Sequence, residues 1–142
     1  MRFVEMVQLR RDALNPAYSV DSPAVCAMGV VRAAGKFLKH LARSTRDEPL
    51  GTDHRPAVVE ALGDMLAYCC GIADDSCEPF TQDKYSCAEC VADVLRLAAD
   101  AIVVRVSPYM LVSSVYTLCH VCAISVDEAF KISLEKMQCL KL

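Results

Sequence analysis

The chain has 142 residues, 54% of them hydrophobic, and its mean hydropathy is +0.29. This length can bury one sizeable core but not two independent ones, which predicts a single domain over 1–142. Fifteen Lys and Arg residues against 18 Asp and Glu residues give a formal charge of -3. That balance lacks the basic face needed for sequence-independent nucleic-acid binding, so no nucleic-acid partner is expected.

Sparse glycine and proline favour helices. Five Gly and six Pro are too few for the frequent tight turns of a β-sandwich. No apolar run reaches the roughly 18 uninterrupted residues that span a bilayer, and residues 1–15 lack the apolar region of a signal peptide. We therefore expect an all-α cytoplasmic protein with no membrane partner, whose surplus apolar surface is buried in a homo-oligomer, at least a homodimer.

Apolar spacing predicts six helices in chain order, at 3–14, 24–42, 56–73, 87–106, 108–123 and 126–140. A charged loop is expected over 43–55 and a short segment around 78–84. Asn15-Pro16 and Ser107-Pro108 end helices, because the residue before proline avoids the helical region. The expected N-cap residues are Asp21 or Ser22, then Ser86, then Ser125 with Glu128 in a capping box.

Two short patterns occur twice along the chain. Cys26-x3-Val30-x-Arg32-x-Ala34 recurs as Cys90-x3-Val94-x-Arg96-x-Ala98, and Cys69-x3-Ala73-x4-Glu78-x-Phe80 recurs as Cys119-x3-Ala123-x4-Glu128-x-Phe130. These matches predict two pseudo-repeated helical hairpins, about 22–84 and 86–140, that form a four-helix core with the first and last helices packed outside. Chance identity of common residues is the alternative.

The segment 58–68, Val-Val-Glu-Ala-Leu-Gly-Asp-Met-Leu-Ala-Tyr, resembles a helix of the MazG-like, all-α nucleoside triphosphate pyrophosphohydrolase superfamily, usually Glu-Leu-Gly-Asp-Val-Leu-Trp-Tyr. Asn15-Pro16 and 28–36 are similar to that family's Asn-Pro and Gly-Leu-Ala-Gly-Glu-Ala-Gly-Glu. Residues 125–128, with Ser133-x-x-Lys136, are similar to its closing helix, where Asn-x-x-Lys follows an acidic start. The resemblance implies a MazG-like helical bundle that hydrolyses a nucleoside triphosphate to the monophosphate and pyrophosphate, with Mg²⁺ held by carboxylates.

Most of the acids that the family uses for Mg²⁺ are missing. Carried onto this sequence, the four positions are Ala33, Lys36, Ala61 and Asp64, and in the second copy Leu97, Asp100, Leu111 and Ser114. The resemblance therefore implies a reduced metal site of Asp64 and Asp100, supplemented by Glu60 one turn before Asp64. The alternative for these acids is ion pairing on a solvated helix face, and no catalytic residue is assigned.

Basic residues offer a second kind of site. Lys36 and Lys39 belong to a basic cluster that runs down the second helix, and Lys136 lies in the closing helix. A lysine ammonium binds phosphate as a point charge, so Lys36 and Lys39 are expected to contact a bound nucleotide; a solvated basic face is the alternative. The resemblance of the closing helix implies the same role for Lys136. Two interpretations stay open: a Mg²⁺-dependent pyrophosphohydrolase, or a noncatalytic relative that binds a nucleotide, a small apolar ligand or another protein.

Nine cysteines include the pattern Cys87-x-x-Cys90 and Cys119-x-x-Cys122, which is also a zinc pattern. Structural zinc sites usually hold their thiolates on glycine-bearing loops, whereas these lie at the head of one apolar helix and in the middle of another. We therefore expect reduced core cysteines in preference to zinc or a redox pair.

Overall fold

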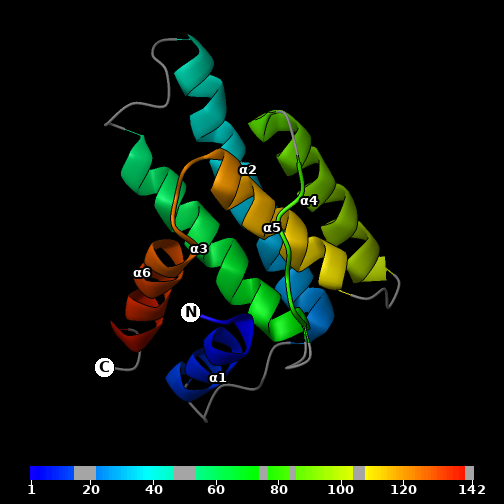
Figure 1. Cartoon of the computed structure of the whole chain (residues 1–142), viewed down its shortest axis with the longest axis vertical. Helices are drawn as coiled ribbons and strands as arrows, with labels where there is room; N and C mark the ends of the chain where they lie inside the picture. Colours follow the sequence, from blue (N-terminus) through cyan, green and yellow to red (C-terminus); the bar gives the residue numbers. More distant parts are fainter. Residues whose placement is uncertain (15–21, 47–53, 74–76, 84–85, 104–107, 140–142) are drawn as a thin grey trace.

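The computed structural model of the chain describes residues 1–14, 22–46, 54–73, 77–83, 86–103 and 108–139, and only the backbone of 43–46. These residues form six α-helices and no strand, which confirms the all-α prediction (Figure 1). The helices are α1 (Phe3–Ala13), α2 (Pro23–Arg46), α3 (Arg55–Ile72), α4 (Cys87–Val103), α5 (Tyr109–Val121) and α6 (Val126–Cys139).

The helix ends follow the predicted capping residues. The hydroxyl oxygens of Ser22, Ser86 and Ser125 accept hydrogen bonds from the backbone N–H groups of Val25, Glu89 and Glu128, at 3.2, 3.2 and 3.4 Å. The expected loop start was wrong, because α2 continues to Arg46. Arginine is a good helix former whose side chain needs no core, so the helix outlasts its apolar stretch. Asn15-Pro16, Asp21, Ser107 and the rest of the charged loop up to residue 53 lie outside the described residues.

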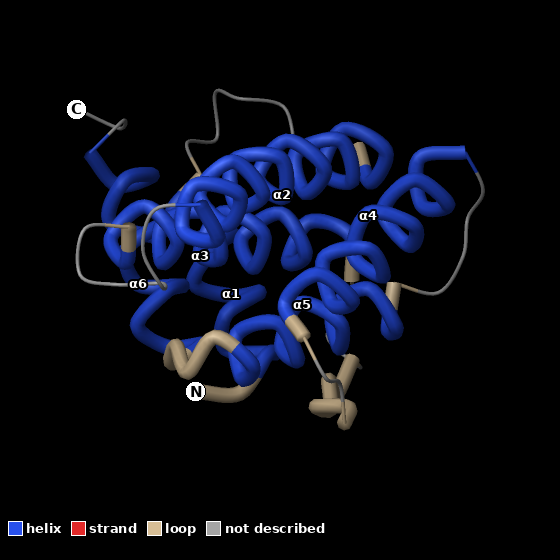
Figure 2. The backbone as a smooth tube through the Cα atoms, turned by 90° about the horizontal axis from the view of Figure 1, so that it is seen from above, coloured by secondary structure: helices blue, strands red, loops and turns tan. Residues whose placement is uncertain are grey.

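Four helices surround the core in a square. α2 packs against α3 and α4, and α5 packs against α4 and α3, so that α3 and α4 lie on a diagonal of the square and do not contact each other. The views from the front and from above show the same arrangement (Figures 1 and 2). α1 and α6 pack on the outer side of α3 and against each other.

The central helix of the fold is α3. It contacts α1, α2, α5 and α6, and ten of its residues are buried around most of its circumference. A helix that is apolar on nearly every side is typical of a position inside a bundle. The two carboxylates of this helix, Glu60 and Asp64, therefore lie between α3 and the helices packed against it, α2 and α6.

The segment 77–83 is an extended connection that runs along α5 (Figure 1). Two buried hydroxyls on α5 accept hydrogen bonds from its backbone, Ser113 Oγ from the N–H of Phe80 at 3.2 Å and Thr117 Oγ1 from the N–H of Gln82 at 2.9 Å. The rings of Phe80 and Tyr109 also pack, with centroids 5.4 Å apart. Side chains of α5 thus take the place of a partner strand for this segment.

None of the described helices has by itself the length and apolarity needed to cross a membrane; α5 and α6 reach that threshold only as a pair bent by 110°.

Candidate functional site

The candidate site lies where α6 crosses α3. Lys136 Nζ of α6 lies 2.9 Å from Glu60 Oε1, and 2.9 and 3.1 Å from the two carboxylate oxygens of Asp64. Ser133, one turn earlier on α6, donates its hydroxyl to Asp64 Oδ1 at 3.1 Å. One ammonium therefore bridges both carboxylates of α3.

Helical spacing explains why these four side chains meet. Glu60 and Asp64 are four residues apart on α3, and Ser133 and Lys136 are three apart on α6, so each pair lies on one face of its helix. The two helices pack directly against each other, which turns these faces together. The sequence grouped Glu60 with Asp64 and singled out Lys136, but it gave no signal that Lys136 would bind the two acids.

The ion pairs shift two pKa values. The hydrogen bond from Lys136 and then its charge lower the pKa of Glu60 below its ordinary value of 4.5, against a smaller opposing effect of burial, and Lys36 lowers it further. Partial burial lowers the pKa of Lys136, but the hydrogen bonds and charges of Glu60 and Asp64 outweigh it and leave this pKa above 10.5. Both effects favour the charged forms, so Glu60 and Lys136 form an ion pair near neutral pH.

A pocket of about 280 Å³ opens beside the bridge, between α2 and α3. Its lining residues are Lys36, Lys39, His40, Ala57, Glu60, Ala61 and Asp64. Lys36 and Lys39 are three apart on α2, so both ammonium groups are on the same side of that helix. Four of the six predicted site residues line this pocket, and Lys136 of α6 contacts two of them, so the structure brings five of the six to one region.

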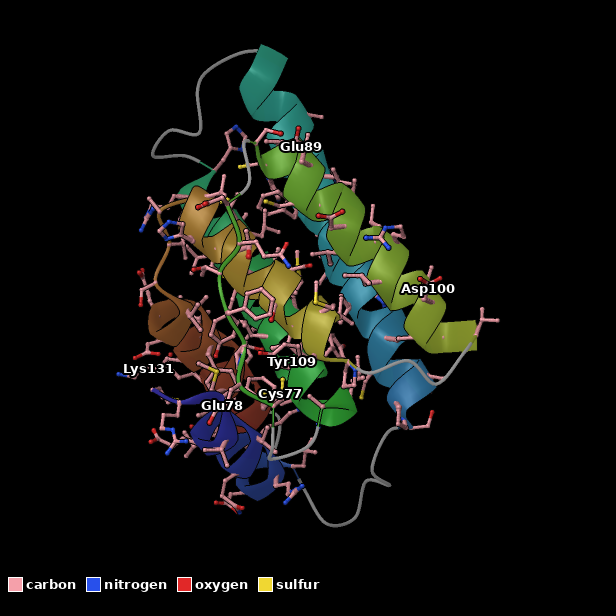
Figure 3. All side chains as sticks on the ribbon, turned by 45° about the vertical axis from the view of Figure 1, so that its right-hand side comes forward. Cys77, Glu78, Glu89, Asp100, Tyr109 and Lys131 are labelled. Carbon is pink, nitrogen blue, oxygen red and sulfur yellow. The ribbon has the colours of Figure 1, made fainter. Side chains whose placement is uncertain are left out.

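Asp100, the sixth predicted site residue, lies elsewhere. It is exposed near the C-terminal end of α4, on the side of the molecule opposite α6 (Figure 3). Since α4 does not contact α3, Asp100 is not brought to Glu60 and Asp64. Among the described residues, no three His, Cys, Asp or Glu side chains are grouped as ligands for a metal ion.

The two CxxC motifs lie close together, with a sulfur–sulfur contact between Cys87 and Cys122. Cys87 at the start of α4 and Cys122 just after α5 have their sulfurs 3.5 Å apart, while Cys90 and Cys119 are buried. All nine cysteines are free thiols. Burial raises the pKa of Cys119 to about 12, and it also raises the pKa of Cys122, where the neighbouring Cys87 adds to the shift. Thiols of this kind pack as small hydrophobes and are poor nucleophiles near neutral pH.

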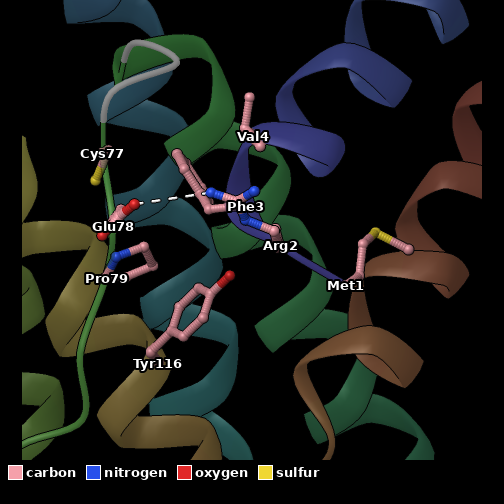
Figure 4. Close-up of a pocket in the computed structure, with 8 residues that line it drawn as sticks. All are labelled: Met1, Arg2, Phe3, Val4, Cys77, Glu78, Pro79 and Tyr116. Carbon is pink, nitrogen blue, oxygen red and sulfur yellow. Dashed lines mark ion pairs between the residues drawn. The ribbon is translucent and has the colours of Figure 1, made fainter.

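A second cavity, of about 400 Å³, lies at the start of α1 against the segment 77–83 (Figure 4). Arg2 and Glu78 form an ion pair across its rim, with 3.7 Å between Nη2 and Oε1. The Tyr116 hydroxyl on its wall donates to Met6 Sδ at 3.6 Å. These polar groups already have partners, and the amino terminus of Met1, which also lines the cavity, is paired with Asp127 at 3.0 Å.

Comparisons with protein families, with curated proteins and with solved structures find no match to this chain. The MazG-like resemblance therefore stays a prediction from the sequence.

Proposed function

We propose that this protein binds a nucleotide through its phosphates in the pocket between α2 and α3, and that it does so without hydrolysing it. Lys36 and Lys39 supply ammonium groups from α2, and Lys136 of α6 adds a third positive charge beside the pocket, on Glu60 and Asp64. We further propose that the bundle is a divergent MazG-like fold, in which the hairpins α2–α3 and α4–α5 are the two pseudo-repeats. The paired packing of these helices, with α1 and α6 outside, supports that topology.

The observation that carries the proposal is the bridge from Lys136 to Glu60 and Asp64. From the α6 side, Lys136 already offsets one of the two carboxylate charges that could repel a phosphate. Three lysines against two carboxylates leave one net positive charge around the pocket. Where positive charges outnumber carboxylates, the ammonium groups remain available to phosphate oxygens, which accept charge-assisted hydrogen bonds.

The same bridge argues against Mg²⁺-dependent catalysis at this site. Mg²⁺ prefers several oxygen ligands in octahedral geometry, and usually relies on carboxylates together with substrate phosphates. At this site a metal ion would have to displace the Lys136 ammonium from both acids. Lys36, moreover, lowers the pKa of Glu60 through its charge, so it lies close enough to repel a cation there. The alternative is a hydrolase with Mg²⁺ on Asp64 and Glu60, and the experiment must distinguish it from nucleotide binding without hydrolysis.

Thermal unfolding with a panel of nucleoside triphosphates tests the proposal, because a ligand that binds only the folded state raises the Tm by mass action. We expect a rise for the wild-type chain with and without Mg²⁺, and a loss of that rise in the double variant Lys36→Gln, Lys39→Gln. Lys131→Gln is the matched control, since Lys131 is exposed on α6 and does not line the pocket (Figure 3).

A parallel assay for pyrophosphate release separates the two interpretations. Binding without release supports the proposal. Release that needs Mg²⁺ and disappears in Asp64→Ala would replace it with the hydrolase interpretation. A Tm unchanged by every nucleotide would reject nucleotide binding altogether.

A further inference from the structure

Arg10 of α1 is a buried cation. Its side chain belongs to the helix face formed by Phe3, Met6 and Val7, and only 5% of the residue is exposed. Its Nη2 donates to Cys26 Sγ at 3.9 Å, a long contact to a weak sulfur acceptor, and its buried Nε has no hydrogen-bond partner. No carboxylate of the described residues lies within ion-pair distance of this guanidinium.

The surrounding residues do not provide an anion. Burial raises the pKa of the nearby Cys70 thiol to about 12, although the charge of Arg10 lowers it, so this thiol is neutral near pH 7 and cannot be the counterion. Gly71 leaves room for the guanidinium, because a Cβ there would lie 3.1 Å from Nη1 and 3.2 Å from Cζ of Arg10. The fold thus holds a largely buried charge that no described carboxylate compensates, which is unfavourable unless an anion binds.

A pocket of about 280 Å³ meets Arg10 between α1, α3 and α6. At one side it is lined by Asp64, Ser133 and Lys136, which are already bonded to one another. The rest of its lining is mainly apolar: Leu14, Ala67, Met137 and the ring of Tyr68. Arg10 is the charged group of this lining that has no charged partner among the described residues.

From this arrangement we propose that the pocket binds a small organic monocarboxylate with an apolar body. Its carboxylate pairs with the Arg10 guanidinium, whose planar donor group matches the two carboxylate oxygens. Its apolar part lies against Leu14, Ala67 and Met137. The volume is slightly below the roughly 300–1,000 Å³ of pockets for drug-sized ligands, so a compact acid fits. A monoanion balances the single uncompensated charge, whereas a phosphate dianion would add a charge without a partner.

This site is separate from the proposed nucleotide pocket. The two lie on either side of Asp64, but the carboxylate is held by Arg10 of α1, and the nucleotide phosphates by Lys36 and Lys39 of α2. The double variant Lys36→Gln, Lys39→Gln should therefore keep the carboxylate response. Failure of one proposal leaves the other intact.

The test places a carboxylate inside the pocket. Met137 lines it from α6, so Met137→Glu offers Arg10 an internal counterion, while Met137→Gln has the same shape without the charge. We expect benzoate to raise the Tm of the wild type and of Met137→Gln and to leave Met137→Glu unchanged, with chloride at equal ionic strength as the salt control. A benzoate response that survives in Met137→Glu, or that is missing from the wild type, overturns the proposal.

A spectroscopic measurement reports on Arg10 itself. In the wild type labelled with nitrogen-15 arginine, the Nε–H signal that is absent from Arg10→Lys should shift saturably with benzoate and less with acetate. Arg11→Lys, at the next and exposed position of α1, identifies its own signal and should not affect the response. An Arg10 signal that responds to inorganic phosphate as strongly as to benzoate overturns the assignment to a carboxylate, and one that responds to neither overturns the site.

Discussion

The backbone carbonyl of Ala129 on α6 lies in the space that a Cβ would occupy at Gly63 on α3. This close approach brings α6 onto the central helix at the turn between Glu60 and Asp64. Ser133 and Lys136 follow Ala129 on α6, so the same contact sets the distance over which Lys136 reaches both acids. Gly63 therefore helps to form the candidate site, because its lack of a side chain lets α6 approach α3.

Gly63→Ala should destabilise the protein and weaken the bridge. The added methyl meets backbone, which cannot move aside as a flexible side chain could, so we expect a loss of about 2–3 kcal/mol or more in the free energy of unfolding. Gly35→Ala is the control, because a Cβ at this exposed position of α2 meets nothing within 4 Å. It should be neutral or stabilising by about 0.5–1 kcal/mol, since alanine favours the helix. Equal Tm values for the two variants would contradict the close packing.

Acid should weaken the contact between α3 and α6. The pKa of Glu60 is lowered in the folded protein, so its contribution to stability is present above its ordinary value of 4.5 and is lost as the pH falls through the lowered pKa. Glu60 and Lys136 are both about half exposed, and such pairs contribute only about 0.2–1 kcal/mol. Denaturant unfolding of Glu60→Gln, Lys136→Met and the double variant, at pH 7 and in acid, measures the coupling as a double-mutant cycle. A coupling that stays constant into acid would show that Glu60 does not form the pair.

Alkaline conditions should destabilise the fold through its buried thiols. Burial raises the pKa of Cys70 and of Cys119 to about 12 in the folded protein, against an ordinary value of 9.0. Between these values the unfolded chain has lost protons that the folded chain keeps, so stability is unaffected below the ordinary value and falls as the pH rises above it. The slope is about 1.4 kcal/mol per pH unit for each proton.

Denaturant unfolding from neutral to alkaline pH checks this slope, and Cys119→Ala should reduce it. If Cys119→Ala leaves the slope unchanged, the prediction is contradicted, because groups other than Cys119 would then cause the loss of stability at alkaline pH.

Mild oxidation should join Cys87 to Cys122 before any other pair. Their sulfurs are 3.5 Å apart, and a small movement brings them to the roughly 2.05 Å of a disulfide. An azo oxidant such as diamide accepts the two electrons and two protons that the thiols lose. Peptide mapping of Cys139→Ser, which lacks the exposed thiol, should find this disulfide, and its formation should be slow because the pKa of Cys122 is raised. A disulfide between Cys87 and Cys90 instead would contradict the geometry.

The sequence predicted the helices well because their signals are local. Serine before an apolar run predicted three N-caps, and each hydroxyl accepts the expected backbone bond. The end of α2 was predicted too early because the charged residues after Ala42 still favour helix, and apolar spacing does not detect a solvated helical turn.

The partners of charged residues could not be predicted in the same way. Lys136 and Asp64 are far apart in the chain, and their contact depends on how α6 crosses α3. Arg10 did carry a local signal: it follows Phe3, Met6 and Val7 at helical spacing, so it occupies an apolar face. Asp100 was grouped with Asp64 through the proposed repeat, but the helices that carry them lie on a diagonal of the bundle.

Titration calorimetry of Asp64→Asn with a nucleoside triphosphate, in a chelator that removes divalent ions, tests the central claim most directly. If the pocket binds phosphate through lysines, removing the Asp64 charge should leave the affinity unchanged or increase it, although Lys136 keeps its contact with Glu60. Lys36→Gln with Lys39→Gln should reduce the affinity by at least about tenfold, or about 1.4 kcal/mol. Binding that needs Mg²⁺ and is lost in Asp64→Asn would contradict the account and show that the acids hold a metal ion.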